Sequence, residues 1–462
     1  MGNGQTDTTT ADAWAALGGT PDLAATVTYA PSAGALPARL PVRELARATV
    51  GVCSLAAAEL DARRSGRPVE SLAEIRVAEA AVATAFVSER HVRINGRQPV
   101  SFAPLSGFWH AADGWVRTHA NYPHHRARLL AALGIPARGT PDQLVERLRT
   151  ELAARPARET QETAYAAGAL AVAMAEPGAS PVPLDGLPLI ESRPGPDAGP
   201  RPLPAAALPA EGVRVLDLSR VIAGPVATRT LAVLGADVLR VDTPRLPEDP
   251  DAHADTGFGK RSTRLDLGDP RDRRTFDELL ARADVVVSGY RPGALDRFGL
   301  DPDTLAERHP GLITAQLCAW GWSGPWTGRR GFDSLVQAGT GIAALEAGPD
   351  GRPGVLPAQA LDHGTGYLIA AAVLRALTGR QDSGAGRRLR LSLAGTASWL
   401  MHGVTPVPES GPGHDPAPWL AETDSAYGPL RYARSPLARP GGGGFTWSCP
   451  PGRWGADAAR WR

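Results

Sequence analysis

Val213-Arg-Val-Leu-Asp-Leu218 is a short, mostly apolar run of the kind that forms a buried strand. The segment Pro225–Leu234 that follows it favours a helix, and Ala236-Asp-Val-Leu-Arg-Val-Asp242 is a second run of the first type. A strand, a helix of about ten residues and another strand form a crossover unit, which places the two strands parallel in one sheet. The run therefore predicts an α/β fold whose parallel sheet is covered by helices on both faces.

The local pattern predicts further elements on either side of this unit. Beyond residue 242 it predicts strands over Thr263–Leu267, Asp284–Ser288, Leu312–Ala319 and Leu389–Leu393, and helices over Arg271–Arg282, Ala294–Phe298, Asp303–His309 and Thr396–Met401. Before residue 177 it predicts helices over Val42–Arg64, Leu72–Val87, His124–Leu133, Pro141–Ala154 and Glu162–Ala167, strands over His91–Asn95 and Ala169–Ala173, and a hairpin turning at Asp113-Gly114.

Composition divides the chain into five segments. We expect a flexible lead-in over 1–38, a smaller α+β region over 39–176, a Pro/Gly linker over 177–210, the large α/β domain over 211–402 and a Pro/Gly/Trp-rich segment over 403–462.

Composition also restricts the class of protein. Hydrophobic residues make up 43% of the 462 residues and charged residues 21%, which is typical of a globular protein. A net charge of +1 gives no general attraction to nucleic acid or to an anionic membrane. We find no signal peptide and no apolar run long enough to span a membrane, and three widely spaced cysteines without a CxxC pair suit a reducing compartment. We therefore expect a cytoplasmic protein without nucleic-acid or membrane partners.

One carboxylate stands out at a junction between a loop and a helix. Val355-Leu-Pro-Ala-Gln-Ala-Leu-Asp362-His-Gly-Thr-Gly366 leads into the apolar segment Tyr367–Leu377, which predicts a helix. Asp362 could cap that helix by accepting bonds from its first N–H groups, or it could be a nucleophile. The two roles are compatible. Gly364 and Gly366 would let a ligand approach the backbone closely.

Three loops that follow or precede strands could bind an anionic ligand. Ser219-Arg-Val-Ile-Ala-Gly-Pro225 opens a helix whose free N–H groups suit a phosphate, although a simple tight turn explains it equally well. Lys260, the only lysine, and Arg261 stand in a Gly-rich loop, where a solvated pair is the common alternative. The stretch Arg291–Arg297 follows a strand, and we expect these loops to meet at one edge of the sheet.

A metal site is the weaker interpretation of a histidine group in the smaller region. His119, His124 and His125, near Asp113, match no helix-face ligand spacing. Gly321-Trp-Ser-Gly-Pro325 lacks the last glycine of a nucleophile elbow.

Several of these motifs occur together in one known family. Taken in order, they closely resemble the family III CoA-transferases (the CaiB/BaiF, formyl-CoA transferase type), over about residues 212–402. The matching stretches are Val213–Pro225, Leu234–Asp242, Gly259-Lys-Arg-Ser262, Arg291–Gly299, Gly331-Phe-Asp333 and Ala360-Leu-Asp362.

The resemblance implies a Rossmann-like large domain with a smaller α+β domain, and an interlocked homodimer. It also implies that Asp362 attacks an acyl-CoA thioester, forms an anhydride and then an aspartyl-CoA thioester, and passes CoA to a carboxylic acid without a metal. Coenzyme A is then a co-substrate. By the same resemblance, Val221 and Ile222 line the CoA site, Lys260 and Arg261 lie near its phosphates, Arg297 contacts its nucleotide end and Tyr290 packs near its adenine.

The order of the segments departs from the family. Residues 106–175 resemble the family's small domain and return segment, which normally follow the large domain. A permuted order, or a tandem ancestor that lost half of each copy, would explain this. Gly441-Gly-Gly-Gly444 is similar to a glycine loop that covers the active site in some members, although a flexible tail is the common meaning.

Two alternatives to CoA transfer stay open. An acyl-CoA racemase or epimerase of the same family would need a histidine where Phe332 stands, with His363 as a possible substitute. A non-catalytic CoA-binding protein is the other alternative. The acyl group is not predicted, although the Trp-rich stretch Trp320–Trp326 hints at an apolar one.

Overall fold

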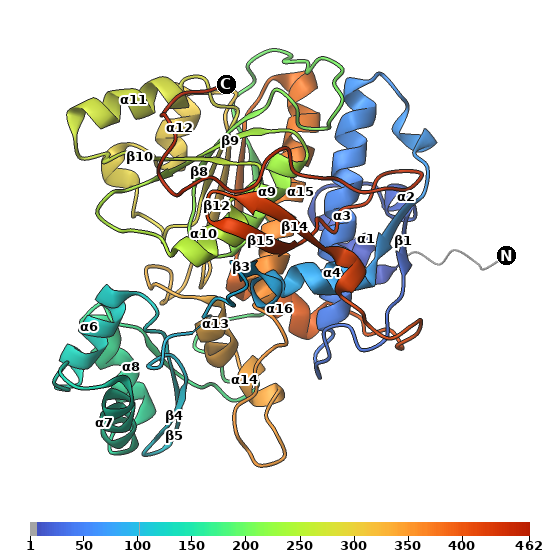
Figure 1. Ribbon diagram of the computed structural model, residues 1–462. Coiled ribbons are helices and arrows are strands. Elements are labelled where there is room, and N and C mark those ends of the chain that lie inside the picture. The colour runs from blue at the N-terminus through green and yellow to red at the C-terminus, as the bar shows by residue number, and fades with distance from the viewer. Residues whose placement is uncertain (1–6, 101) are drawn as a thin grey trace.

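A seven-stranded sheet forms the centre of the computed structural model, which describes residues 7–100 and 102–462 (Figure 1). The strand order is β10-β9-β8-β11-β12-β13-β7, and all neighbours are parallel except β13 and β7. The strands are β7 (Glu191–Pro194), β8 (Arg214–Leu218), β9 (Asp237–Asp242), β10 (Arg261–Arg264), β11 (Val285–Ser288), β12 (Ile313–Cys318) and β13 (Arg387–Ser392). The prediction of a mixed α/β fold with a largely parallel sheet is confirmed.

Alternate residues of each strand contribute to two separate cores, because successive side chains point to opposite faces of a sheet. Val215 and Val287 belong to the core that contains α9 (Ala223–Val233) and α15 (Ala360–Ser383). Leu216 and Val286 belong to a second core with α11 (Pro270–Leu280) and α12 (Pro302–Arg308). Helices therefore cover both faces. The remaining elements of this part are α10 (Pro250–Thr256), η2 (Asp296–Phe298), α13 (Asp333–Gly339), α14 (Ile342–Leu345) and α16 (Leu393–His402).

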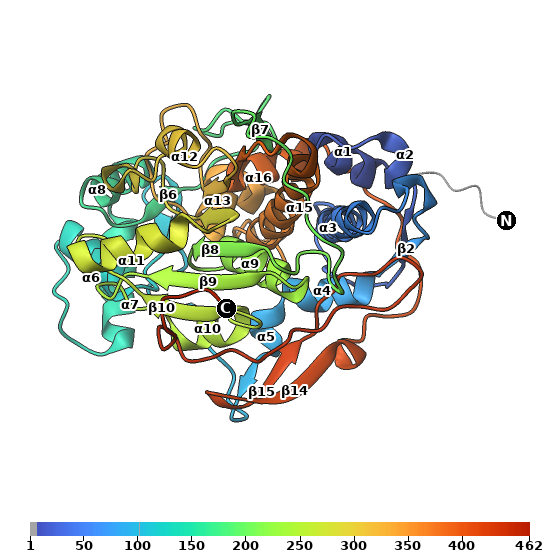
Figure 2. The same ribbon diagram turned by 90° about the horizontal axis from the view of Figure 1, so that it is seen from above.

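Helix α15 lies buried between two other helices. It packs against α9 on one side and against α3 (Val42–Arg64) on the other (Figure 2). A Cβ atom on Gly366 would lie 2.6 Å from the carbonyl oxygen of Ala223, and one on Gly364 would lie 2.8 Å from Leu45 Cδ2. These glycines were expected to admit a ligand, but the structure uses them for close helix packing.

We expect Gly366→Ala to destabilise the protein by about 1–3 kcal/mol, because the added methyl group would push the backbone of α15 away from the backbone at Ala223. Gly379→Ala is the matched control in the same helix, since nothing lies within 4 Å of its added Cβ. That variant should gain about 0.5–1 kcal/mol from helix propensity. Urea unfolding of both variants checks the prediction, and equal effects would contradict it.

The N-terminal part is more ordered than its composition suggests. Residues 8–30 form α1 (Thr8–Ala16), α2 (Pro21–Ala24) and β1 (Val27–Ala30), because Asp7 caps α1 and Trp14 is fully buried. Of the expected flexible lead-in, residues 1–6 lie outside the described residues. The helix predicted over Leu72–Val87 is instead β2 (Ile75–Ala78) followed by α4 (Glu79–Phe86), because β2 pairs in parallel with β1. The short elements η1 (Val69–Ser71) and α5 (Ser88–His91) flank them.

The N-terminal elements repeat an order found in the large sheet. Strand β1, the long helix α3, strand β2 and the short helix α4 come in the same order as β12, α15, β13 and α16, although α13 and α14 lie between β12 and α15. Both strand pairs are parallel, and α3 and α15 have 23 and 24 residues. The two long helices lie side by side, so the two repeats meet in the core.

Residues 105–171 build a separate small core (Figure 1, teal). Its sheet has the order β4-β5-β6, and the hairpin predicted at Asp113-Gly114 is confirmed as the β4–β5 turn. The elements are β4 (Phe108–Ala111), β5 (Gly114–Thr118), β6 (Ala171–Ala173), α6 (Pro123–Ala132), α7 (Pro141–Ala153) and α8 (Ala157–Ala166). Strand β5 contacts α13, which brings this small core against the large sheet's helices.

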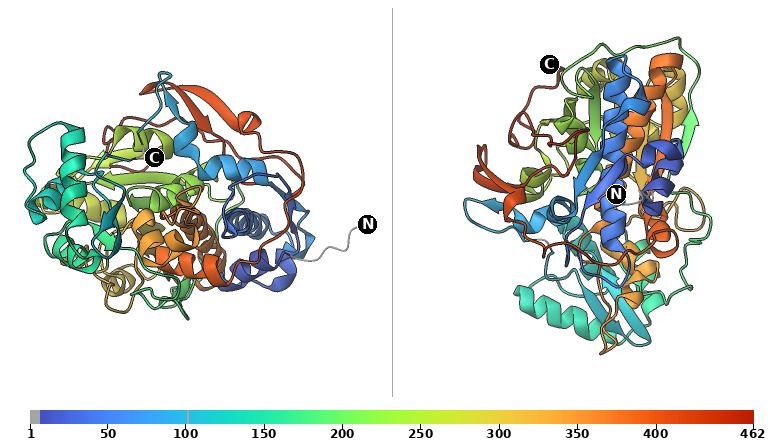
Figure 3. Two further views of the ribbon diagram at one scale, coloured as in Figure 1. Left: turned by 90° about the horizontal axis from the view of Figure 1, so that it is seen from below. Right: turned by 90° about the vertical axis from the view of Figure 1, so that its right-hand side faces the viewer.

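The C-terminal residues also form regular structure. Strands β14 (Leu420–Ser425) and β15 (Gly428–Ala433) follow η3 (Ala417–Trp419), and β15 pairs with β3 (Arg93–Ile94) at the periphery (Figure 3). The tail then runs along β10, where Ser262 accepts a bond from the N–H of Asp457. Among residues 7–100 and 102–462, no helix is long and apolar enough to cross a membrane.

Candidate active site

Two buried aspartates meet at the starts of α13 and α15. Asp362 is the third residue of α15, and Asp333 is the first residue of α13. The Asp333 carboxylate accepts the N–H of Asp362 at 2.9 Å and also bonds from the N–H of Leu361 and the amide of Gln337. Asp333 therefore accepts hydrogen bonds from the free N–H groups in the first turn of α15. The expected capping role of Asp362 is wrong, because no described residue donates a hydrogen bond to its carboxylate.

The two carboxylates raise the cost of ionising each other. Burial raises the pKa of Asp362 well above its usual value, and the charge of Asp333 raises it further. Burial also raises the pKa of Asp333, to about 6, although three hydrogen bonds and the charge of Arg117 oppose that rise. Asp362 is only 6% exposed. When ionised, it is a poorly solvated carboxylate, which is the state that makes a carboxylate a strong nucleophile.

The small core supplies an aromatic wall next to this pair. The ring of His119 stacks on Phe332, which immediately precedes Asp333, with centroids 3.8 Å apart. Tyr122 and His125 also contact that ring. Burial lowers the pKa of His119 and of His125 to about 3, so both are neutral near pH 7. No group of three His, Cys, Asp or Glu within the described ranges is arranged to hold a metal ion.

His363, the other histidine beside Asp362, lies elsewhere. Its ring stacks on Phe86 at 5.3 Å, and its Nε2 is 3.9 Å from the carboxylate of Glu89. Two of the tryptophans that hinted at an acyl pocket, Trp320 and Trp326, are packed in the main core. Trp320 is 1% exposed, contacts Trp326 edge to face, and donates a bond to the carbonyl of Arg330.

Loops at the carboxyl edge of the sheet approach the same region. Val221 has a φ of 71°, which is strained for a β-branched residue, and it stands next to Ile222, the residue that opens α9. The loop that carries Tyr290 lies against this one, since a Cβ on Gly289 would be 3.5 Å from Ser219. The predicted site residues Val221, Ile222 and Tyr290 therefore lie at one edge.

Arg220 links this edge to the small core. Its guanidinium donates to the carbonyls of Leu246 and Pro247, pairs with Glu248, and lies 5.4 Å from the ring centroid of Tyr122. Tyr122 in turn donates to Glu248 at 3.1 Å. These bonds hold the start of α6 over the carboxyl edge.

The other predicted cations are placed differently. The Lys260 ammonium is buried and donates to Asp217, to the Pro225 carbonyl and to Thr228, at 3.1, 2.9 and 2.6 Å, which uses all three of its donors. Burial lowers its pKa to about 8. Arg261 pairs with Asp237, at the amino end of β9, and Arg297 is exposed over the ring of Phe298. Arg261 therefore lies at the amino edge of the sheet, away from Val221, whereas Arg297 belongs to the loop that follows β11.

Arg128 and Arg330, which the sequence did not single out, form a cationic group at this edge with Arg291 of the predicted loop. Burial lowers the pKa of Arg330, which precedes α13, and the charges of Arg291 after β11 and Arg128 of α6 lower it further. None of the three forms an ion pair with a described residue. Their positions in the sequence could have identified two of them as candidates, because Arg291 is the first residue of the loop after a strand and Arg330 directly precedes Gly331-Phe-Asp333.

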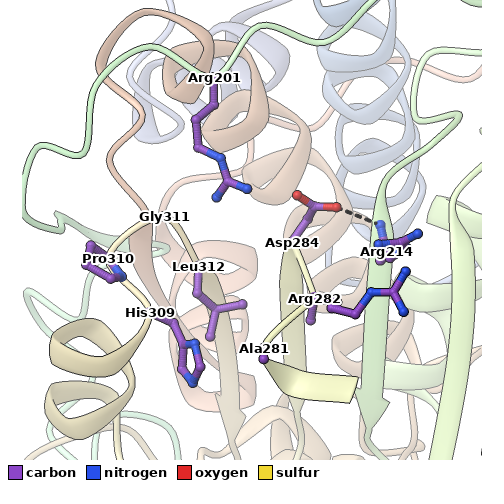
Figure 4. Close-up of a pocket in the computed structure, with 10 residues that line it drawn as sticks. Arg201, Arg214, Ala281, Arg282, Asp284, His309, Pro310, Gly311 and Leu312 are labelled. Atoms are coloured by element: carbon purple, nitrogen blue, oxygen red, sulfur yellow. Dashed lines mark hydrogen bonds between the residues drawn. The ribbon is translucent and has the colours of Figure 1, made fainter. Parts of the chain in front are cut away.

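A cavity of about 320 Å³ lies at the opposite edge of the sheet (Figure 4). Residues at the amino ends of β8, β11 and β12 line it, including Arg214, Asp284 and Leu312, and the Asp284 carboxylate accepts the N–H of Arg214 at 3.0 Å. It contains none of the predicted site residues.

A parallel α/β sheet with a buried, unbonded carboxylate and a cationic carboxyl edge is typical of an enzyme that acts on an anionic ligand. Residues 210–432 match the sequence profile of CoA-transferase family III, which assigns this part of the chain to that family.

Named relatives are similar over part of the chain. A probable fatty acyl-CoA transferase of Mycobacterium tuberculosis is 34% identical over 230 residues, 46% of this chain and 58% of that protein. A formyl-CoA:oxalate CoA-transferase of Streptomyces coelicolor is 34% identical over 194 residues (40% and 47%). A succinyl-CoA:glutarate CoA-transferase of Mus musculus is 35% identical over 191 residues (38% and 44%). The chain thus spans about half the length of the curated relatives it matches.

Solved structures are similar over a comparable share. The crystal structure of a hypothetical protein from Mycobacterium tuberculosis is 34% identical and covers 44% of this chain and 57% of its own, with a TM-score of 0.40. That of a CAIB/BAIF family protein from Brucella suis is 28% identical (49% and 66%), also with a TM-score of 0.40.

Proposed function

We propose that the protein transfers CoA between an acyl-CoA donor and a carboxylic acid acceptor, with Asp362 as the nucleophile. The observation that carries this proposal is the state of the Asp362 carboxylate. It is buried and receives no hydrogen bond from the residues described, while its own N–H is held by Asp333. The fold therefore fixes the backbone of Asp362 and leaves its oxygens free to react.

The proposed reaction needs no net proton transfer. An Asp362 oxygen attacks the thioester carbon, the C–S bond breaks, and an anhydride and CoA thiolate form. The thiolate attacks the Asp362 carbonyl carbon, which releases the donor acid as a carboxylate and leaves an aspartyl-CoA thioester. The acceptor carboxylate attacks that thioester to form a new anhydride and thiolate. Attack by the thiolate on the acceptor's acyl carbon then gives the new acyl-CoA and restores the Asp362 carboxylate.

The carboxyl edge fits a CoA co-substrate. The strained Val221 with Ile222 and Tyr290 would line its site, and the unpaired Arg128, Arg291 and Arg330 would face its phosphates. Exposed Arg297 stays a candidate for the nucleotide end. A phosphate contact for Lys260 and Arg261 stays a prediction; the bonds of Lys260 to Asp217, Pro225 and Thr228 favour an indirect role, in which it positions the first turn of α9.

We also propose how the chain is organised into domains and subunits. The strand order, with β8 in the centre and reversal between β8 and β11, supports a Rossmann-like large domain. The separate core of residues 105–171 supports a smaller α+β domain. The interlocked homodimer stays a prediction that light scattering can test. A mass of twice 48.3 kDa would support a homodimer, and a mass of 48.3 kDa would exclude one.

A racemase or epimerase is the second candidate function. His119 favours it, because this buried, neutral histidine stacks on Phe332 and its Nδ1 has no partner in the described part of the chain. Such an imidazole could move a proton at the α-carbon of an acyl group. Incubation in deuterium oxide separates the two functions, since only the racemase incorporates deuterium at that carbon without an acceptor acid.

Mass spectrometry of the protein incubated with a set of acyl-CoAs tests the proposed function. We expect a hydroxylamine-sensitive adduct on the peptide that contains Asp362. CoA binding with no adduct and no deuterium incorporation would instead support a non-catalytic CoA-binding protein.

We expect Asp333→Asn to shift the acid limb of the pH–rate profile to lower pH by about one unit or more. The negative charge of Asp333 raises the pKa of Asp362, so removing that charge lets Asp362 ionise at lower pH. The asparagine oxygen can still accept the N–H of Asp362. Rates of CoA transfer from pH 4.5 to 8.5 check this, and an unshifted limb would show that Asp333 does not act through its charge.

A further inference from the structure

Arg117 is a buried arginine in the wall between the small core and the two aspartates. It lies on β5, is 7% exposed, and its guanidinium stands between the rings of Phe102 and Phe108, at 5.1 and 5.0 Å from their centroids. His119, two residues further along, stacks on Phe332 next to Asp333. Residues two apart share a face of a strand, so the face of β5 that carries Arg117 turns towards α13.

The guanidinium lacks the partners that a buried charge normally has. No described residue forms a hydrogen bond or an ion pair with the guanidinium of Arg117, and its Nε is fully buried without a partner. Every other buried arginine of the described chain forms at least one hydrogen bond or ion pair through its guanidinium. Arg240 pairs with Asp242 and Glu248, and Arg380 pairs with Asp284, for example. Burying an unpaired charge is costly, so a planar, forked donor kept in this state is suited to an anion that arrives with the substrate.

The position of Arg117 defines which anion this is. Strand β5, which carries Arg117, packs against α13, the helix that begins at Asp333, whereas Asp362 lies on α15. The guanidinium thus approaches the site from the side of Asp333. An anion bound to Arg117 lies away from the acyl carbon, at the far end of a short acyl group.

We propose that Arg117 binds the free carboxylate of a dicarboxylic acyl group, so that the substrates are short dicarboxylic acids and their mono-CoA thioesters. The inference rests on the proposed function of Asp362 as the nucleophile. The aromatic rings on either side hold the guanidinium plane in position, and the neutral His119 and His125 add no competing positive charge. This replaces the apolar acyl group suggested by the tryptophans, two of which pack in the core.

Exchange of a labelled acid into its own CoA thioester tests the proposal. Succinate with succinyl-CoA and butyrate with butyryl-CoA have the same chain length and differ by the terminal carboxylate. We expect the wild-type protein to favour the succinyl pair in kcat/KM. Arg117→Met should lower the succinyl-to-butyryl ratio about 10- to 100-fold, the loss of one charge-assisted pair. Arg117→Lys, which keeps the charge without the fork, should lie between them.

Arg155→Met is the control for loss of an arginine in the same small core. Arg155 pairs with Glu151 at its outer surface, so the ratio should stay at the wild-type value. Circular dichroism of each variant shows whether it folds. If Arg117→Met does not fold, the ratio measured for Arg117→Lys tests the proposal instead. A wild-type preference for butyryl-CoA, or an unchanged ratio in Arg117→Met, would overturn the proposal while exchange itself still supports the nucleophile.

Binding of free acids separates failure of this inference from failure of the proposed function. If neither acid exchanges, the transferase function is wrong, and calorimetry with succinate and butyrate still tests Arg117. Tighter binding of succinate by the wild-type protein, lost in Arg117→Met, would support the carboxylate site. Equal affinity of both proteins for succinate would assign Arg117 to packing between Phe102 and Phe108 alone.

Discussion

Replacing Asp362 with asparagine should lower the rate of CoA transfer at least about a thousandfold, because an amide cannot form the anhydride. Donor acyl-CoA should also leave no hydroxylamine-sensitive adduct on the variant. Labelled-acid exchange and mass spectrometry on the same samples measure both effects. Asp350→Asn is the control, since Asp350 lies in an exposed loop and pairs only with Arg352. Exchange within tenfold of the wild-type rate in Asp362→Asn would exclude the nucleophile.

The same variant should be at least as stable as the wild-type protein at neutral pH. The folded state raises the pKa of Asp362, so it binds this proton more tightly than the unfolded chain does. The resulting stabilisation is present below the unfolded pKa of about 4 and is lost as pH rises through the folded pKa. At pH 7 the ionised carboxylate is therefore a cost that asparagine removes. The gain should shrink towards pH 4, and a large loss of stability at pH 7 would contradict the raised pKa.

Replacing Lys260 with methionine should destabilise the protein by about 3–5 kcal/mol, the typical effect of removing one partner of a buried ion pair. The variant leaves Asp217, which is 0% exposed, without its cation. Urea unfolding measures the change. Adding Asp217→Asn to Lys260→Met should recover part of the loss, because the unpaired charge is then gone.

Arg245→Met is the matched control for this prediction. Arg245 forms an ion pair with Asp266, but its side chain is 76% exposed, so its loss should cost less than about 1 kcal/mol. An effect of Lys260→Met as small as that of the control would mean that the Asp217 pair is not a structural requirement. Lys260 would then be free for the phosphate contact that the resemblance implies.

Local pattern predicted much of the large sheet. Strands β8, β9 and β11 are runs of buried residues, and each lies within one or two residues of its predicted bounds. Helix α3 occupies the predicted Val42–Arg64. The hairpin at Asp113-Gly114 was also predictable, because its turn chemistry lies in adjacent residues.

Elements that depend on distant partners were missed. Strand β7 lies in the Pro/Gly-rich linker and exists because it pairs with β13. Strand β15 pairs with β3, more than 300 positions earlier in the chain. Helix α15 was predicted to begin at Tyr367 but begins at Ala360, because Asp333 of another helix satisfies its first N–H groups.

In the candidate site, too, the features that depend on residues distant in the sequence could not be predicted. The junction at Asp362 could be recognised from the sequence, but the pairing with Asp333 and the approach of Arg117 depend on how three elements pack. Lys260 looked like a phosphate ligand because no local feature shows that Asp217, 43 residues earlier, would receive it.

The repeated order of β1-α3-β2-α4 and β12-α15-β13-α16 places two carboxylates in matching positions. Glu44 is the third residue of α3, as Asp362 is of α15. Glu44 pairs with Arg43 and accepts the N–H of Val407 at 3.0 Å, so its charge is neutralised and its oxygens are occupied. Within the described chain, Asp362 has neither partner. The two halves are built alike, but one carboxylate is bonded within the fold, and the other, which we propose as the nucleophile, is left without a hydrogen bond.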